Sequence, residues 1–156
     1  MSHPSRFALT AVAVGALLLG ACGEDNGRVD DPTSTSTAVA GQAENTVNVD
    51  MKEFSMTPGR TSVASGEISF RALNSGTIEH EMRVIRTDLD AKALPMESGG
   101  AQADISKVDQ RLSITGVNAG QSKTEKVRLA AGKYVLLCNL PAHYQSGMVA
   151  PFTVTP

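Results

Sequence analysis

The sequence predicts an all-β domain, and two observations support that prediction. Apolar residues alternate with polar ones at a period of two rather than 3.6, which is the pattern of strands with one buried face. Turn-forming residues separate these runs, as in Pro58-Gly59, Asn74-Ser75-Gly76 and Ala131-Gly132-Lys133. Short alternating strands joined by such turns favour an antiparallel β-sandwich or barrel.

The expected strands can be placed in order along the chain. Residues 88–110 do not fit the alternation and contain Pro95 and Gly99-Gly100, so they predict a long excursion with one short helix near Asp90 to Leu94. Later, a strand from Gly132 is expected to close at Cys138. The apolar positions that define the other strands are Val47, Val49 and Met51, then Ile68, Phe70 and Ala72, then Met82 and Val84 after His80, then Val127 and Leu129, and finally Ala150, Phe152 and Val154 after Met148.

Residues 1–21 are expected to form an export signal. Met1 to Arg6 carries one firm positive charge, and Phe7 to Leu19 is an unbroken run of apolar or small residues. The run is shorter than the roughly 20 residues of a membrane-spanning helix and fits the apolar region of a secretory signal. The sequence Leu19-Gly20-Ala21-Cys22 resembles the lipobox of bacterial lipoproteins. That resemblance implies cleavage before Cys22, a lipid on its sulfur, and a protein anchored at the outer face of the cell membrane or in the periplasm of a bacterium.

Two regions follow the signal. Residues 22–45 are rich in Asp, Ser, Thr, Gly and Ala, which predicts a disordered, flexible tether, whereas residues 46–156 have the composition of one globular domain. Arg6 is the only charged residue of the Lys, Arg, Asp and Glu types before Cys22, so processing leaves 13 basic against 16 acidic side chains. Because no basic cluster is present, nucleic acid is not an expected partner.

Four residues of the domain are candidates for a metal site. Once the signal is removed and Cys22 carries a lipid, Cys138 has no partner for a disulfide, and only His80 and His143 remain as histidines. Cys138, His143 and Met148 follow one another on one strand–loop–strand segment with the spacing C-x4-H-x4-M. His80 lies 58 residues before Cys138, at a core-facing strand position. This spacing predicts metal binding rather than three unrelated core residues.

The spacing C-x4-H-x4-M resembles the copper loop of the cupredoxins, the small blue-copper proteins that include plastocyanin, azurin, auracyanin and rusticyanin. The matches extend to Gly132-x-Tyr134-x-x-x-Cys138, to Cys138-Asn139-Leu140-Pro141-Ala142-His143 and to an upstream Asn74…His80 segment. The resemblance covers residues 46–156 and implies a Greek-key β-sandwich. It also implies single-electron transfer rather than enzymatic catalysis.

The same resemblance implies the ligands of one copper ion. His80, Cys138 and His143 would be the trigonal ligands and Met148 the weak axial one. Sulfur donors suit Cu(I), and imidazole accepts both Cu(I) and Cu(II). One position departs from the pattern: the family often has Asn directly after the upstream His, where it ties the two ligand loops together, and this chain has Glu81.

Partners can also be expected from the position of His143. It lies in mid-loop between Ala142 and Tyr144, so the resemblance implies a ring edge at the surface and transient docking of redox partner proteins through a small apolar patch there. The protein is expected to be a monomer.

Other functions fit the residues less well. Multicopper oxidases and copper nitrite reductases carry a His beside the Cys, where this chain has Leu137 and Asn139. A thiol hydrolase built on Cys138 and His80 lacks a recognisable orienting acid and oxyanion hole. An interaction domain that never binds metal is disfavoured by the intact ligand set. Copper storage or delivery to another envelope protein stays open as the alternative, and it requires a weaker and more open site.

Overall fold

The computed structural model describes residues 45–156, so the expected signal peptide, Cys22 and all but the last residue of the expected tether lie outside the described residues. In the described part of the chain, no helix is long and apolar enough to cross a membrane. The elements are nine strands and one 3-10 helix: β1 (Thr46–Lys52), β2 (Ser55–Pro58), β3 (Ser62–Ala64), β4 (Gly66–Asn74), β5 (His80–Arg86), η1 (Ile105–Lys107), β6 (Asp109–Val117), β7 (Ser122–Leu129), β8 (Gly132–Leu137) and β9 (Val149–Thr155).

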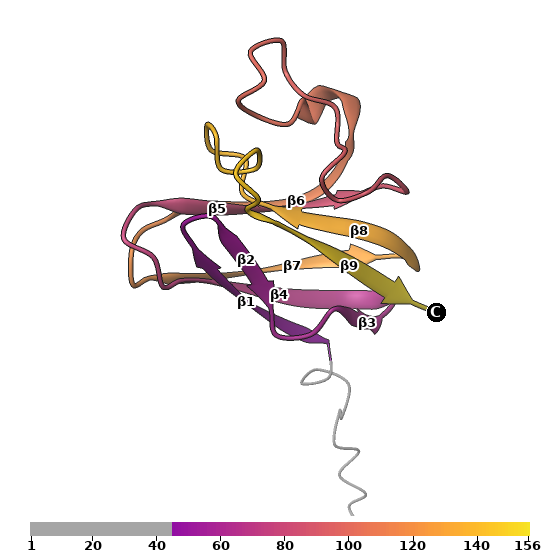
Figure 1. The fold of residues 1–156 in the computed structure, drawn as a ribbon. Coiled ribbons are helices and arrows are strands. Elements are labelled where there is room, and N and C mark those ends of the chain that lie inside the picture. Colours follow the sequence, from indigo (N-terminus) through magenta and orange to yellow (C-terminus); the bar gives the residue numbers. More distant parts are fainter. Residues whose placement is uncertain (1–44) are drawn as a thin grey trace, which may run out of the picture. The chain divides into compact units, whose positions relative to one another are not determined.

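The strands form the predicted two-sheet sandwich (Figure 1). One sheet has the order β2-β1-β4-β7 and the other has the order β3-β9-β8-β5-β6. The prediction of a purely antiparallel sandwich is wrong in two places, because β1 pairs with β4, and β3 with β9, in parallel. The reason is that β3 joins the opposite sheet, so the chain crosses between sheets and re-enters the first one in the direction of β1. Alternation reports which face is buried and carries no information on direction.

The core lies between the sheets and is built from the alternating residues. Val47, Val49, Met51 and their counterparts in β4 are fully buried, as the period of two predicts. The rings of Phe70 in β4 and Phe152 in β9 meet edge to face with their centroids 5.6 Å apart, which joins the two sheets. His80, Cys138 and Met148 are buried at the edge of this core.

The five-stranded sheet is also covered on its outer face. Residues 87–108, which correspond to the excursion predicted over residues 88–110, leave β5 and return to β6 across that face (Figure 1). They complete a second apolar group, called here the outer cluster, which consists of Ile85, Leu94, Ala103, Val135, Leu137 and Tyr144. Burial on both faces explains why four successive residues of β8 are buried.

The short helix expected near Asp90 to Leu94 is absent, and a turn takes its place. The Ala93 N–H donates to the Asp90 carbonyl at 2.9 Å, and the Lys92 N–H donates to the Asp90 side chain at 2.9 Å. Asp favours this local turn over a helix, and Pro95 disfavours helical geometry at Leu94. The one helical turn of the excursion is η1, which begins after the Asp104 cap.

Candidate metal centre

Three strand ends and one loop bring the predicted site residues together. His80 is the first residue of β5, Cys138 follows β8 directly, and Met148 precedes β9 directly. One hydrogen bond joins the two ends of the loop, from the Cys138 N–H to the Met148 carbonyl at 3.1 Å, and a second ties its end to its middle, from the Met148 N–H to the His143 carbonyl at 3.0 Å. Gly147, with a φ of 101°, supplies the turn that the loop needs before Met148.

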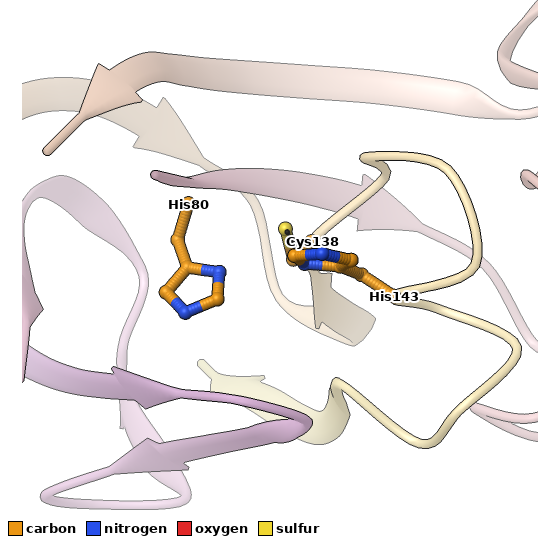
Figure 2. Close-up of side chains that lie close together, drawn as sticks. All are labelled: His80, Cys138 and His143. Carbon is orange, nitrogen blue, oxygen red and sulfur yellow. Dashed lines mark hydrogen bonds between the residues drawn. The ribbon is translucent and has the colours of Figure 1, made fainter. Parts of the chain in front are cut away.

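The donor atoms of His80, Cys138 and His143 converge. One ligand atom from each residue lies within 4.8 Å of the other two, and Figure 2 shows the three side chains turned toward a common space. The Cys138 Sγ atom lies 3.3 Å from the His143 Nδ1 atom, and the two imidazole rings have centroids 5.2 Å apart. His80, Cys138 and Met148 are fully buried, and His143 is 8% exposed. The loop and the start of β5 therefore gather buried donors of the predicted types.

His80 shows that this cluster suits a metal ion. Both ring nitrogens are buried and neither has a hydrogen-bond partner. A buried polar atom without a partner costs about 1–3 kcal/mol, so such atoms are rare and call for an explanation. Two imidazoles, a thiolate and a nearby thioether are donors that copper accepts in both oxidation states. The residues present fit the ion that the sequence predicts.

Burial has the largest influence on the pKa values of His80 and Cys138. Burial lowers the pKa of His80 from its ordinary value, and the neighbouring His143 lowers it further. Burial raises the pKa of Cys138, while hydrogen bonds from the backbone N–H groups of Glu81 and Leu140 act in the opposite direction. His80 is thus in the neutral form that ligates metals, whereas the Cys138 thiol must lose its proton on metal binding.

The loop that carries His143 is held by the excursion. The Asn139 side chain accepts from the Ala103 N–H at 2.8 Å and donates to the Ala103 carbonyl at 3.1 Å. The Ala142 N–H donates to the Ala101 carbonyl at 2.8 Å. The Tyr144 hydroxyl accepts from the Leu94 N–H at 3.0 Å and donates to the Ala91 carbonyl at 2.9 Å. Asn139 and Tyr144 thereby fix the residues on both sides of His143.

The segment before His80 is held in a different way. The Asn74 amide donates to the carbonyls of Ile78 and Val117 at 2.6 and 2.8 Å. Glu53, in the turn between β1 and β2, accepts from the N–H groups of Thr77 and Ile78 at 2.6 and 3.0 Å. Hydrogen bonds from the backbone, with that of Thr77 the largest contribution, lower the pKa of Glu53 to about 2. The turn of β1–β2 is thus tied to the approach to His80.

Glu53 also lies beside the candidate ligand itself. Its Oε1 atom is 3.7 Å from the His80 Nε2 atom, which is too long for a hydrogen bond, and a neutral His80 makes no ion pair with it. The sequence analysis missed Glu53, Asn139 as a clamp, and Tyr144. The contacts of Asn139 and Tyr144 span 36 to 53 residues of sequence. The glycine at position 76 leaves room for Glu53, because a Cβ atom there would lie 2.7 Å from the Glu53 carboxylate.

Glu81, the residue that departs from the expected pattern, still connects the two ligand segments. Its carboxylate accepts a hydrogen bond of 3.2 Å from the Asn139 N–H. Glu81 directly follows His80, and Asn139 directly follows Cys138. The tie that the family often makes with Asn is therefore made here with a carboxylate.

A two-sheet β-sandwich with buried histidines and a cysteine gathered at its strand ends defines this protein as a cupredoxin. The sequence profile of the Sulfocyanin (SoxE) domain matches residues 36–155, and the chain belongs to that family. No curated protein matches the sequence significantly. Cupredoxins are generally electron-transfer proteins rather than enzymes and are typically exported or periplasmic, and the family and the donor set together support one copper ion as the cofactor.

Solved structures share the fold. The reduced auracyanin of the photosynthetic bacterium Roseiflexus castenholzii superposes with a TM-score of 0.55 at 22% identity, covering 72% of this chain and 98% of its own. Auracyanin B gives a TM-score of 0.52 at 23% identity, covering 71% of this chain and 88% of its own. A rusticyanin gives 0.51 at 13% identity, covering 71% and 78%. At these identities the likeness confirms the all-β cupredoxin fold.

Proposed function

We propose that this protein transfers single electrons through one copper ion that His80, Cys138 and His143 hold in a trigonal arrangement, with Met148 as the weak axial ligand. The observation that carries the proposal is the convergence of three buried donors within 4.8 Å, with both nitrogens of His80 left without a protein partner. Copper bound at such a site supplies a one-electron couple.

The surroundings of the ligands support electron transfer over copper storage or delivery. A fast exchange of electrons requires ligands that move little between the two oxidation states. Here His80 is fixed at the start of a strand, and the His143 loop is fixed by Asn139 and Tyr144. Delivery requires release of the ion, whereas three of the four candidate ligands are fully buried.

His143 is the proposed exit for the electron. It is the one candidate ligand with measurable exposure, and its ring meets the edge of Phe54 at a centroid distance of 5.5 Å. Phe54 is 47% exposed, and Pro141 and Ala142 of the same loop are also exposed. These residues provide a small apolar surface for transient docking of a redox partner protein to a monomer of this chain.

The test of the copper site is optical. Cu(II) added to the purified protein is expected to give an intense blue or green colour from charge transfer between the Cys138 thiolate and copper. The variant Cys138→Ser should lack the colour, because the thiolate is gone while the size of the side chain is kept. Copper that binds to the parent protein without colour would reject electron transfer and favour storage or delivery.

The proposed location rests on Cys22. We infer that the protein is exported and held by acyl chains on Cys22, with residues 23–45 as the tether that lets the domain reach its partners. In cell fractionation, Cys22→Ser is expected to move from the membrane to the soluble fraction and to keep its colour. A variant that remains with the membrane would show that the lipobox interpretation is wrong.

A further inference from the structure

Glu81 is a buried carboxylate at the point where β5 and β8 separate. The register that pairs Arg83 with Leu137 places Glu81 opposite Asn139. Backbone pairing between the two strands ends at Leu137, and beyond it the Glu81 Oε1 atom accepts a hydrogen bond from the Asn139 N–H at 3.2 Å. The side chain therefore continues the pairing for one more position, next to Cys138.

The backbone of the same residue lies beside Cys138, since the N–H group of Glu81 acts on the Cys138 thiol. Because Glu81 also follows His80 directly, its position depends on one candidate ligand and constrains another. Its side chain and its backbone thus act on the same segment, the first through Asn139 and the second through the sulfur.

Arg83 balances the charge of this carboxylate. Its Nε and Nη2 atoms donate to the two carboxylate oxygens of Glu81 at 2.7 and 3.2 Å, and its Nη1 atom donates to Gln110 at 2.8 Å. The Glu81 side chain is 6% exposed and that of Arg83 is 23% exposed, so water screens this pair weakly. Removing either partner leaves the other as an uncompensated charge near the metal centre.

We propose that Glu81 and Arg83 form a paired-charge strap that positions the Cys138 sulfur and sets the reduction potential of the copper site through the balance of their charges. The inference rests on the proposed function, since the potential is that of the copper couple. An uncompensated positive charge disfavours the more highly charged Cu(II) state and raises the potential. An uncompensated negative charge stabilises Cu(II) and lowers it.

Two single variants and their combination test the charge balance in the copper-loaded protein. Glu81→Gln keeps an oxygen that accepts from Asn139 but removes the negative charge, so its potential should rise. Arg83→Met removes the positive charge, so its potential should fall. Each shift is expected to change the ratio of reduced to oxidised copper about three- to tenfold at a fixed mediator potential, where tenfold corresponds to about 59 mV for one electron. The reduction potential of the double variant should be close to that of the parent protein.

Two further variants separate charge from structure. Arg83→Lys keeps the positive charge but loses the two parallel hydrogen bonds to the Glu81 carboxylate, so its reduction potential should stay near that of the parent. Glu67→Gln breaks the exposed pair with Lys126 on the four-stranded sheet and should leave the potential unchanged. Shifts of the same sign in Glu81→Gln and Arg83→Met, or a shift in Glu81→Gln no larger than that in Glu67→Gln, would overturn the proposed role of the charges.

The positioning role can be measured without copper. In the metal-free protein, amide hydrogen exchange at Asn139 is expected to be much faster in Glu81→Ala than in the parent and to stay slow in Glu81→Gln. Equal exchange in Glu81→Ala and the parent would overturn the strap even if copper binds as proposed. If Glu81→Ala does not fold, amide exchange at Asn139 is compared between Glu81→Gln and the parent. Exchange at Asn139 as fast as that of an exposed amide in both proteins would reject the hydrogen bond to residue 81. Absence of colour in the copper-treated parent would instead reject the proposed function and leave this measurement intact.

Discussion

The two segments that carry the candidate ligands are held in place by different means. His80 begins β5, where it pairs with Val117 of β6 and is fully buried, and β5 pairs with β8 from Arg83 onward. The loop from Cys138 to Met148 has its two ends joined by one backbone hydrogen bond, and the side chains of Asn139 and Tyr144 tie it to the excursion. Backbone pairing in the sheet fixes the position of a ligand on a strand. Ligands on a loop are instead held by side-chain hydrogen bonds to segments that are distant in the sequence.

The excursion contributes to the support of the ligand loop. Residues 87–108 supply few core residues between the two sheets, yet they cover the outer face of the five-stranded sheet and bind the ligand loop at Ala101 and Ala103. The long, weakly patterned segment is therefore the support of the metal centre. Its removal would affect the loop that carries His143 far more than the strand that carries His80.

The largest effect is expected from Asn139→Leu. The substitution leaves the buried N–H and carbonyl of Ala103 without their partner, at about 1–3 kcal/mol for each group. Urea unfolding of the metal-free protein should report this loss, and the exchange of the Ala142 N–H should accelerate. Asn118→Ala, which removes an exposed amide bonded to Gln121, is the control and should change stability by no more than about 0.5 kcal/mol. Equal stabilities of the two variants would contradict the clamp.

An intermediate effect is expected at Met148, which acts on the potential more than on the fold. Met148→Leu nearly keeps the volume of a buried side chain, so its cost in stability should stay under about 1.5 kcal/mol. The loss of a donor from an apolar site disfavours Cu(II), so the reduction potential should rise and the colour should remain. Met148→Gln offers a harder oxygen donor and should lower the potential. Mediator titrations that fail to separate the two variants in this order would remove Met148 from the ligand set.

The smallest effect on the fold is expected at Ala142, which tests the proposed docking surface. Ala142 has a φ of 68°, a conformation that Asn and Asp tolerate better than most residues. Ala142→Asn and Ala142→Asp are therefore a matched pair that differs by one charge. The Asp variant should exchange electrons with a redox partner more slowly than the Asn variant, with nearly the same spectrum in both. Equal rates for the pair would place the exit of the electron elsewhere.

Much of this molecule could be predicted from its sequence because the relevant patterns are local. Alternation at a period of two identified the buried residues of β1, β4 and β9, and the spacing from Cys138 to Met148 fits within one strand–loop–strand unit. The burial of one strand face and the span of the loop between β8 and β9 both depend on residues that are close together in the chain. The sequence alone also raised the possibility of export, through residues 1–22.

Tertiary structure decided what local patterns cannot report. The parallel pairing of β1 with β4 follows from a crossover of the chain between the two sheets, which alternation along one strand does not show. The partnerships of Glu81, Asn139 and Tyr144 join residues 36 to 58 positions apart. A hydrogen bond over such a distance in sequence forms only after packing has brought the two segments within about 3 Å. The sequence by itself therefore determined the candidate donors of the metal centre, and the folded chain alone determined which residues hold those candidates in place.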